Sequence, residues 1–154
     1  MYDISCVISF FLSKAPMSPK KLQKLLYYAY AWTLALLNES VDDLRFHLFS
    51  DRIEAWVHGP VISEVYGKYR DYGWQNIPQT ESFDDSIFSE DVRDILNQVW
   101  SVYGGFSGNE LEAISHKETP WISARHGIPA YEPSNNPILD KDMFIFYNEQ
   151  ANRQ

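Results

Sequence analysis

Cysteine and long apolar runs are scarce in this chain of 154 residues. A single cysteine, Cys6, excludes an internal disulfide and any zinc site built from several cysteines. It lies among apolar residues, so we expect a small core residue in a reduced, cytoplasmic protein. No run reaches the roughly 18 apolar residues that a membrane span requires. A secretory signal is not expected either, because Asp3 stands where such a signal carries positive charge. These absences predict a soluble protein with no membrane association.

Basic residues are also few, since 13 Lys and Arg face 21 Asp and Glu and the formal net charge is −8. Binding nucleic acid through its phosphates needs a basic stripe, so we expect no direct contact with nucleic acid. The local basic cluster Lys20, Lys21 and Lys24 falls at the start of a predicted helix. A solvated helix face explains this cluster better than a phosphate contact does.

Motifs for catalysis and metal binding are missing as well. The four histidines, His47, His58, His116 and His126, do not show the spacing of a zinc site. The sequence has no Gly-x-Ser-x-Gly elbow, no P-loop and no Gly-x-Gly-x-x-Gly motif. Ser115 and His116 are neighbours on a predicted helix and point apart, so they do not form a nucleophile–base pair. We therefore expect no catalytic residue, no metal and no cofactor.

Apolar residues make up 45% of the chain, which is enough to form a sizeable core. The strongest predicted helix covers residues 18–37, where Ser18-Pro19 supplies a cap and a first-turn proline. Apolar side chains surround most of this helix, which is typical of a central helix. Other helices are predicted to start at Asp3, Pro60, Ser89, Ser107, Thr119-Pro120 and Asp140. Residues 74–88 are predicted to be a surface loop.

Two short stretches alternate between apolar and polar residues. Phe46–Phe49 and Arg52–Val57 therefore predict a two-stranded hairpin over about residues 46–57, turning at Ser50-Asp51. Gly59-Pro60 ends the second strand, and Pro60 suits the first turn of a following helix. The sequence thus predicts a mainly α (α+β) fold: one compact domain over residues 1–154, a helical bundle around helix 18–37 with a small hairpin.

The predicted strand-to-helix junction brings Trp56 and His58 close to a helix N-terminus. Such a corner is able to hold an acidic group of a partner at the free N–H groups of the helix. A rigid corner that only directs the strand onto the helix explains the same pattern equally well. The two interpretations are compatible with each other.

Three blocks of the sequence carry a family resemblance. Lys21–Trp32 is similar to a K-L-x-K-L-L-Y pattern, and Ile53–Tyr66 to E-A-W-x-x-G-P-V-x-x-x-x-Y. Leu111–Trp121 is similar to L-x-x-x-[ST]-H-x-x-x-P-W. In order and spacing these blocks resemble the SocA-like antitoxins, or Panacea domain, which include GepA-type phage-associated proteins. Together the blocks span almost the whole chain.

The resemblance implies an antitoxin that binds and neutralises a cognate protein toxin, or an adaptor that delivers the toxin to a ClpXP-type protease. A homodimer is compatible with it, and an enzymatic activity is not expected. The signature residues, which are also the candidate partner-binding residues, are Trp56, His58, Gly59, Pro60, Tyr66, His116, Pro120 and Trp121. We expect His58 and His116 to meet in the fold.

The alternative is an acid–base enzyme that uses His58 or His116 with a carboxylate such as Glu64 or Glu118. A deep polar pocket around both histidines would favour the enzyme. A dry, packed cluster of histidine and tryptophan would favour the binding protein.

Overall fold

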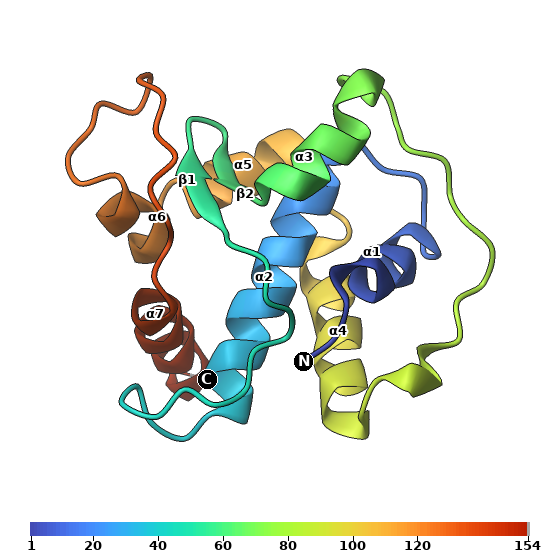
Figure 1. Ribbon diagram of the computed structural model, residues 1–154, viewed down its shortest axis with the longest axis horizontal. Coiled ribbons are helices and arrows are strands. Elements are labelled where there is room, and N and C mark those ends of the chain that lie inside the picture. Colours follow the sequence, from blue (N-terminus) through green and yellow to red (C-terminus); the bar gives the residue numbers. More distant parts are fainter. Residues whose placement is uncertain (154) are drawn as a thin grey trace.

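The computed structural model describes residues 1–153 and has the predicted mainly helical architecture (Figure 1). The helices are α1 (Ile4–Leu12), α2 (Pro19–Leu37), α3 (Ser63–Tyr69), α4 (Glu90–Tyr103), α5 (Gly108–Ser115), α6 (Thr119–Ala124) and α7 (Asp140–Asn152). Two short 3-10 helices, η1 (Arg70–Tyr72) and η2 (Asp85–Ile87), lie between α3 and α4. Strands β1 (Glu54–Trp56) and β2 (Gly59–Val61) form an antiparallel pair.

Helix α2 is the central helix of the fold, as predicted. It packs against α1, α3, α4, α5, α7 and β2. Helices α4 and α7 lie on either side of it (Figure 1). Leu22, Leu25, Tyr28 and Leu34 of α2 are fully buried. A helix this apolar needs neighbours on several sides, and here it has them.

The predicted helix starts are confirmed at four caps. The side chains of Asp3, Ser18 and Ser89 each accept a hydrogen bond from an N–H of the helix that follows. Ser107 and Glu110 form a complete capping box at the start of α5. Each cap satisfies an N–H that the first turn leaves without a helical partner.

The hairpin lies later in the chain than predicted. Glu54 pairs with Val61 and Trp56 with Gly59, so the turn is formed by Val57 and His58. The predicted turn at Ser50-Asp51 and the predicted strand Phe46–Phe49 were wrong. At the beginning of residues 46–49, a side chain makes the hydrogen bonds that a partner strand was expected to make.

That side chain is Asn38, at the end of α2. Its Oδ1 accepts hydrogen bonds from the N–H groups of Arg45 (2.8 Å) and Phe46 (2.9 Å). Its Nδ2 donates to the carbonyl of Phe46 at 3.0 Å. The N–H and the carbonyl of Phe46 are therefore satisfied by a side chain and not by a partner strand, so no ladder begins here.

Pro60 lies in β2 rather than at a helix start, and α3 begins three residues later at Ser63. Gly59 has a φ of +103°, which favours glycine and lets the chain reverse after the turn. Ala55, the partner of Pro60, donates its N–H to Asn136 on its other side. Ala55 and Pro60 therefore face each other at a position where the ladder has no hydrogen bond from Pro60, and the N–H that proline lacks is not needed.

The predicted surface segment between η1 and α4 is attached to the core at Ile77. This residue exchanges two backbone hydrogen bonds with Met17 and is buried. Phe88, at the end of the segment, is buried as well.

Among residues 1–153, no helix combines the length and the apolar character that crossing a membrane requires.

Candidate functional site

The first and second sequence blocks meet where α2 contacts β2. The Gln23 amide donates to the carbonyl of Ile62 (3.0 Å) and accepts from its N–H (2.9 Å). The next residue, Lys24, donates from Nζ to the carbonyl of Pro60 at 3.0 Å. Two side chains of the central helix thus bind the edge of the hairpin as a neighbouring strand would.

The third block joins the same hairpin through Trp121. Its indole N–H donates to the carbonyl of Trp56 at 2.8 Å. The indole ring stacks on His116, with ring centroids 4.2 Å apart. Pro120 is buried beside it in the first turn of α6, although the residue before the helix is Glu118 and not Thr119 as predicted. We call the junction of α2, the hairpin and the α5–α6 segment the hairpin corner.

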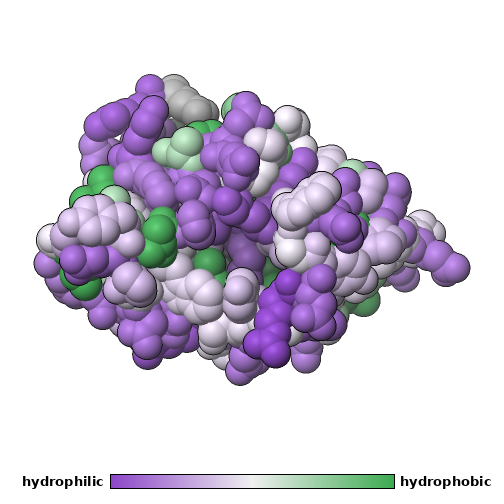
Figure 2. All heavy atoms as spheres, turned by 90° about the horizontal axis from the view of Figure 1, so that it is seen from above, coloured by the Kyte–Doolittle hydropathy of each residue, from purple (hydrophilic) through white to green (hydrophobic). Residues whose placement is uncertain are grey.

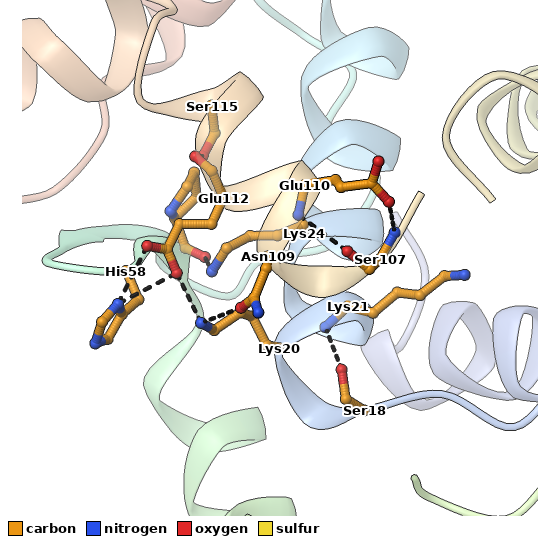
Figure 3. Close-up of polar contacts among 11 residues, drawn as sticks. Ser18, Lys20, Lys21, Lys24, His58, Ser107, Asn109, Glu110, Glu112 and Ser115 are labelled. Atoms are coloured by element: carbon orange, nitrogen blue, oxygen red, sulfur yellow. Dashed lines mark hydrogen bonds and ion pairs between the residues drawn. The ribbon is translucent and has the colours of Figure 1, made fainter. Parts of the chain in front are cut away.

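Glu112 of α5, which sequence reasoning missed, lies at the centre of the polar contacts of the hairpin corner (Figure 3). Its Oε1 lies 2.7 Å from Lys20 Nζ and 3.2 Å from His58 Nδ1. Partial burial raises the pKa of this carboxyl, but Lys20 and His58 outweigh burial and hold it below the usual value. Glu112 therefore carries its charge at neutral pH and links α2, α5 and the turn.

The two signature histidines occupy different environments near Glu112. His58 is at the hairpin turn, with 68% of its side chain exposed. His116 is half-buried, and burial lowers its pKa even though the charge of Glu112 raises it. Its Nε2 is buried and makes no hydrogen bond to any described residue. Both histidines thus lie near one carboxylate, but burial makes the packed His116 bind a proton less readily than an ordinary histidine.

The cavity beside His58 is open and mostly apolar, with a volume of about 390 Å³. It is lined by Trp56, Val57, His58, Pro133, Ser134 and Asn135, so His116 is not part of it. This geometry corresponds to the packed histidine–tryptophan cluster and not to a polar pocket around both rings.

The partly buried Trp56 and the exposed Tyr66 form an aromatic pair at the hairpin corner. Their rings meet edge to face with centroids 5.0 Å apart. The Trp56 indole donates to Glu54 Oε1 at 2.8 Å, and Tyr66 remains 46% exposed. Figure 2 looks onto this end of the molecule, where hydrophilic residues predominate and strongly apolar residues appear in small separate groups.

The basic cluster Lys20, Lys21 and Lys24 was predicted to be a solvated helix face, and this prediction is wrong for Lys24. This lysine is fully buried, and burial lowers its pKa to about 7 despite the nearby charge of Glu112. Lys20 contacts both Glu112 and Asn109, and Lys21 donates to the carbonyl of Gly104 at 2.6 Å. The cluster therefore holds elements together.

Gly59 is the point of closest approach in the hairpin corner. A Cβ atom at this position would lie 2.8 Å from Lys24 Cε and 2.9 Å from Ser115 Oγ. Contacts of this length require the neighbouring atoms to move, so the corner accepts only glycine without rearrangement.

Arg125 connects the hairpin to the loop of residues 127–137, and no sequence pattern indicated this role. The side chain is buried and donates to the carbonyls of Ala55, Pro129 and Glu132. Its guanidinium group also lies over the Trp121 ring, 5.1 Å from the centroid. Carbonyl oxygens and an aromatic face thus replace water around a buried cation.

The carboxylates named for an acid–base enzyme have other partners. Glu118 Oε1 accepts hydrogen bonds from the hydroxyls of Tyr28 (2.7 Å) and Tyr147 (3.0 Å). Burial raises the pKa of Glu118 although both hydroxyls lower it. Glu64 is exposed on α3, and its charge raises the pKa of Asp51 after the larger effect of burial. The carboxylate that contacts the signature histidine His58 is Glu112, which was not predicted.

Within residues 1–153, no three His, Cys, Asp or Glu side chains are grouped closely enough to hold a metal ion.

The fold is a mainly helical domain in which three sequence blocks converge on a hairpin. Comparison with protein-family models matches residues 22–122 to the family described as antitoxin SocA-like, Panacea domain. The match covers more than half of the chain, so the protein belongs to this family. Comparisons with curated proteins and with solved structures gave no match. The matched range contains the hairpin and nearly all of the three blocks, whereas α1 and α7 lie outside it.

Proposed function

We propose that residues 1–154 act as one antitoxin domain, which neutralises a cognate protein toxin by binding it directly in the cytoplasm. Membership of the antitoxin family supports the role. The observation that carries the binding mode is the hairpin corner, which presents Trp56, His58 and Tyr66 on a buried frame. Aromatic residues dominate binding energy at protein interfaces. A rigid frame also reduces the entropy lost on binding.

The formal net charge of −8 on this chain also predicts the charge of its partner. An acidic protein attracts a basic partner over several ångströms and accelerates their encounter. We therefore propose that the toxin is basic, at least on the face that meets this chain.

Catalysis has weaker support than binding. His116 is stacked on Trp121, and His58 pairs with Glu112 at an open surface. Glu118, the buried carboxylate named for the enzyme, already accepts two tyrosine hydroxyls. A general base has to reach a substrate proton within hydrogen-bonding distance, and packing on Trp121 restrains His116 from doing so. Glu118 lines a cavity in which no histidine is among the lining residues, so the histidine–carboxylate pair of an acid–base enzyme does not form there. We propose a non-enzymatic role.

The test of the antitoxin role uses the product of the reading frame adjacent to this gene. We expect that product to stop growth when expressed alone and to be harmless when expressed with this chain. The two proteins should also co-purify as a defined complex. An adjacent product that is harmless by itself, or toxic in the presence of this chain, would contradict the role.

The test of the surface uses Tyr66→Ala and His58→Ala. Both side chains are exposed, so their removal leaves the core intact. Removing an interface hot spot weakens binding by about tenfold or more. We expect both variants to weaken the complex by this factor in calorimetric titrations. Ile145→Ala, on the exposed face of α7, is the matched control. Unchanged affinity in both corner variants would assign toxin binding to another surface.

Neutralisation by occlusion and neutralisation by delivery to a ClpXP-type protease lead to different toxin lifetimes. Under delivery, we expect this chain to shorten the half-life of a tagged toxin only in cells that contain the protease. Under occlusion, the half-life stays the same or increases. Sedimentation velocity of the isolated chain and of the complex decides whether a homodimer takes part.

A further inference from the structure

A second cavity, of about 450 Å³, lies between α4 and α7 and is separate from the cavity beside His58. Helix α2 contributes Trp32 and Leu36 to it, and α4 contributes Val102 and Tyr103. Helices α4 and α7 stand on either side of α2 and form the two walls (Figure 1). Glu118, from the turn before α6, also lines this cavity.

When ionised, Glu118 gives the cavity a negative charge that no lining residue balances. Its Oε1 is occupied by the hydroxyls of Tyr28 and Tyr147, whereas no hydrogen bond joins Oε2 to any of residues 1–153. Among the described residues that line the cavity, Glu118 alone is charged. A carboxylate oxygen with free acceptor capacity in a partly desolvated site interacts strongly with a cation.

Aromatic rings stand beside this carboxylate in fixed positions. The rings of Trp32 and Tyr147 are 5.2 Å apart, and the Trp32 indole donates to the Tyr103 hydroxyl at 2.9 Å. Tyr103 in turn stacks on Tyr28 with ring centroids 4.0 Å apart. Aromatic faces next to a carboxylate favour an organic cation. A hydrated metal ion would require several oxygen ligands, and this cavity offers one carboxylate.

We propose that this cavity binds the side chain of an arginine or lysine carried by a partner protein. The rim favours a polypeptide over a free small cation. Leu36 is 43% exposed and Val102 is 61% exposed at the mouth. Apolar residues that flank the arginine or lysine in the partner would cover Leu36 and Val102. A small free cation would leave these two side chains in water. This site is independent of the hairpin corner and stands whether or not the chain is an antitoxin.

The experiment compares two peptides that differ in one charge, Ac-Ser-Leu-Arg-Leu-Ser-NH2 and the same peptide with neutral citrulline in place of arginine. Binding is followed by calorimetry and by the NMR signal of the Trp32 indole N–H. We expect the arginine peptide to shift that signal and to bind about tenfold more tightly than the citrulline peptide, because its hydrogen bond to Glu118 is charge-assisted. n-Butylguanidinium should bind about tenfold more weakly than the arginine peptide, since it leaves the apolar rim uncovered.

Glu118→Gln tests the carboxylate. The amide oxygen still accepts the Tyr28 and Tyr147 hydroxyls while the charge is removed, so we expect a loss of about tenfold in affinity for the arginine peptide. Val102→Arg places a competing cation at the mouth on an exposed helix position and should weaken the peptide to a similar degree. Ile145→Arg adds the same charge at an exposed position that does not line the cavity, and should leave the affinity unchanged.

Four results would overturn the assignment. Equal affinity for the arginine and citrulline peptides, or no binding of either, would reject recognition of a cation. Full affinity in both Glu118→Gln and Val102→Arg would place binding elsewhere on the molecule. n-Butylguanidinium binding as tightly as the peptide would assign the cavity to small-molecule cations rather than to a protein side chain.

Discussion

Gly59 combines two constraints at one position, namely a φ of +103° and contact with two side chains from other elements. Gly59→Ala would strain the backbone and push against Lys24 and Ser115. Backbone strain and overpacking each cost about 1–3 kcal/mol. We expect the free energy of unfolding, measured by urea denaturation, to fall by about 3 kcal/mol.

Gly67→Ala is the matched control for this substitution. Gly67 lies within α3, and a Cβ there would meet no atom within 4 Å. Alanine is the better helix former by roughly 0.5–1 kcal/mol, so the control should raise stability. Equal effects of the two substitutions would show that Gly59 is tolerant and that the corner repacks around a methyl group.

Lys24 predicts a pH dependence of stability. Burial lowers its pKa from 10.5 to about 7 in the folded chain. Between these values the unfolded chain binds a proton that the folded chain does not, so stability rises with pH across this window. Below about pH 7 both states are protonated and the contribution to the slope vanishes. The maximal slope for one such group is about 1.4 kcal/mol per pH unit.

We expect Lys24→Met to remove this rise, as measured by urea denaturation at pH 7, 8, 9 and 10. Lys14→Met, at an exposed position, should keep the slope of the original protein. A slope that persists in Lys24→Met would mean that another group titrates in this range, and that the buried ammonium is well compensated by the Pro60 carbonyl.

At the scale of elements, Arg125 holds the 127–137 loop against the hairpin. Arg125→Met keeps most of the side-chain volume but removes the donors to Ala55, Pro129 and Glu132. The three carbonyls would then lack the guanidinium partner, and the loop should detach more often. We expect limited proteolysis within residues 127–137 to accelerate by about tenfold. Arg45→Met, at a surface position, should leave the cleavage rate unchanged.

Cleavage of the Arg125 variant at the original rate would show that the remaining bonds hold the loop. One of these runs from Asn136 Nδ2 to the carbonyl of Ala124, at 3.0 Å.

The elements that the sequence predicted are those whose determinants are local. The caps at Ser18, Ser89 and Ser107 lie within three residues of the N–H groups they bind, so a short window of sequence contains the whole motif. The hairpin depends on distant partners instead. β1 is bounded by β2 on one side and by residues 136–138 on the other, and those residues are some 80 positions away in the chain.

Pattern reasoning likewise identified members of the hairpin corner but not its internal chemistry. Trp56, His116 and Trp121 were predicted as signature residues and do lie together. Lys24 was wrongly predicted to be solvated, because a lysine at the start of a helix normally faces water. Only the fold reveals that this lysine points at a backbone carbonyl of a strand 36 residues further on. Whether the corner contacts a partner remains a prediction.

At the scale of the whole molecule, the charge of −8 predicts how binding to a basic toxin responds to salt. Attraction between net charges is screened beyond about 10 Å at 0.1 M ionic strength. We expect the association rate constant, measured by stopped flow, to fall by about tenfold between 20 mM and 500 mM salt, with a much smaller change in the dissociation rate.

A variant that neutralises Glu81, Asp84 and Asp85 provides the comparison. These residues lie in the surface segment between η1 and α4, which runs far from the hairpin (Figure 1). Its association rate should be lower at low salt and should depend less on salt. A toxin that proves strongly acidic, or an association rate insensitive to salt, would contradict electrostatic attraction.

The tyrosine hydroxyls around Glu118 have one further consequence. An ionised carboxylate only accepts, so Tyr28 and Tyr147 both donate to it, and Tyr147 has to accept from Tyr27 at 2.9 Å. One charge thereby fixes the direction of three hydroxyl protons in side chains that are at most 1% exposed. Shielded from water, these protons should exchange slowly and give separate low-field resonances in an ordinary proton spectrum. The unlabelled protein thus carries its own spectroscopic indicator of whether Glu118 is charged.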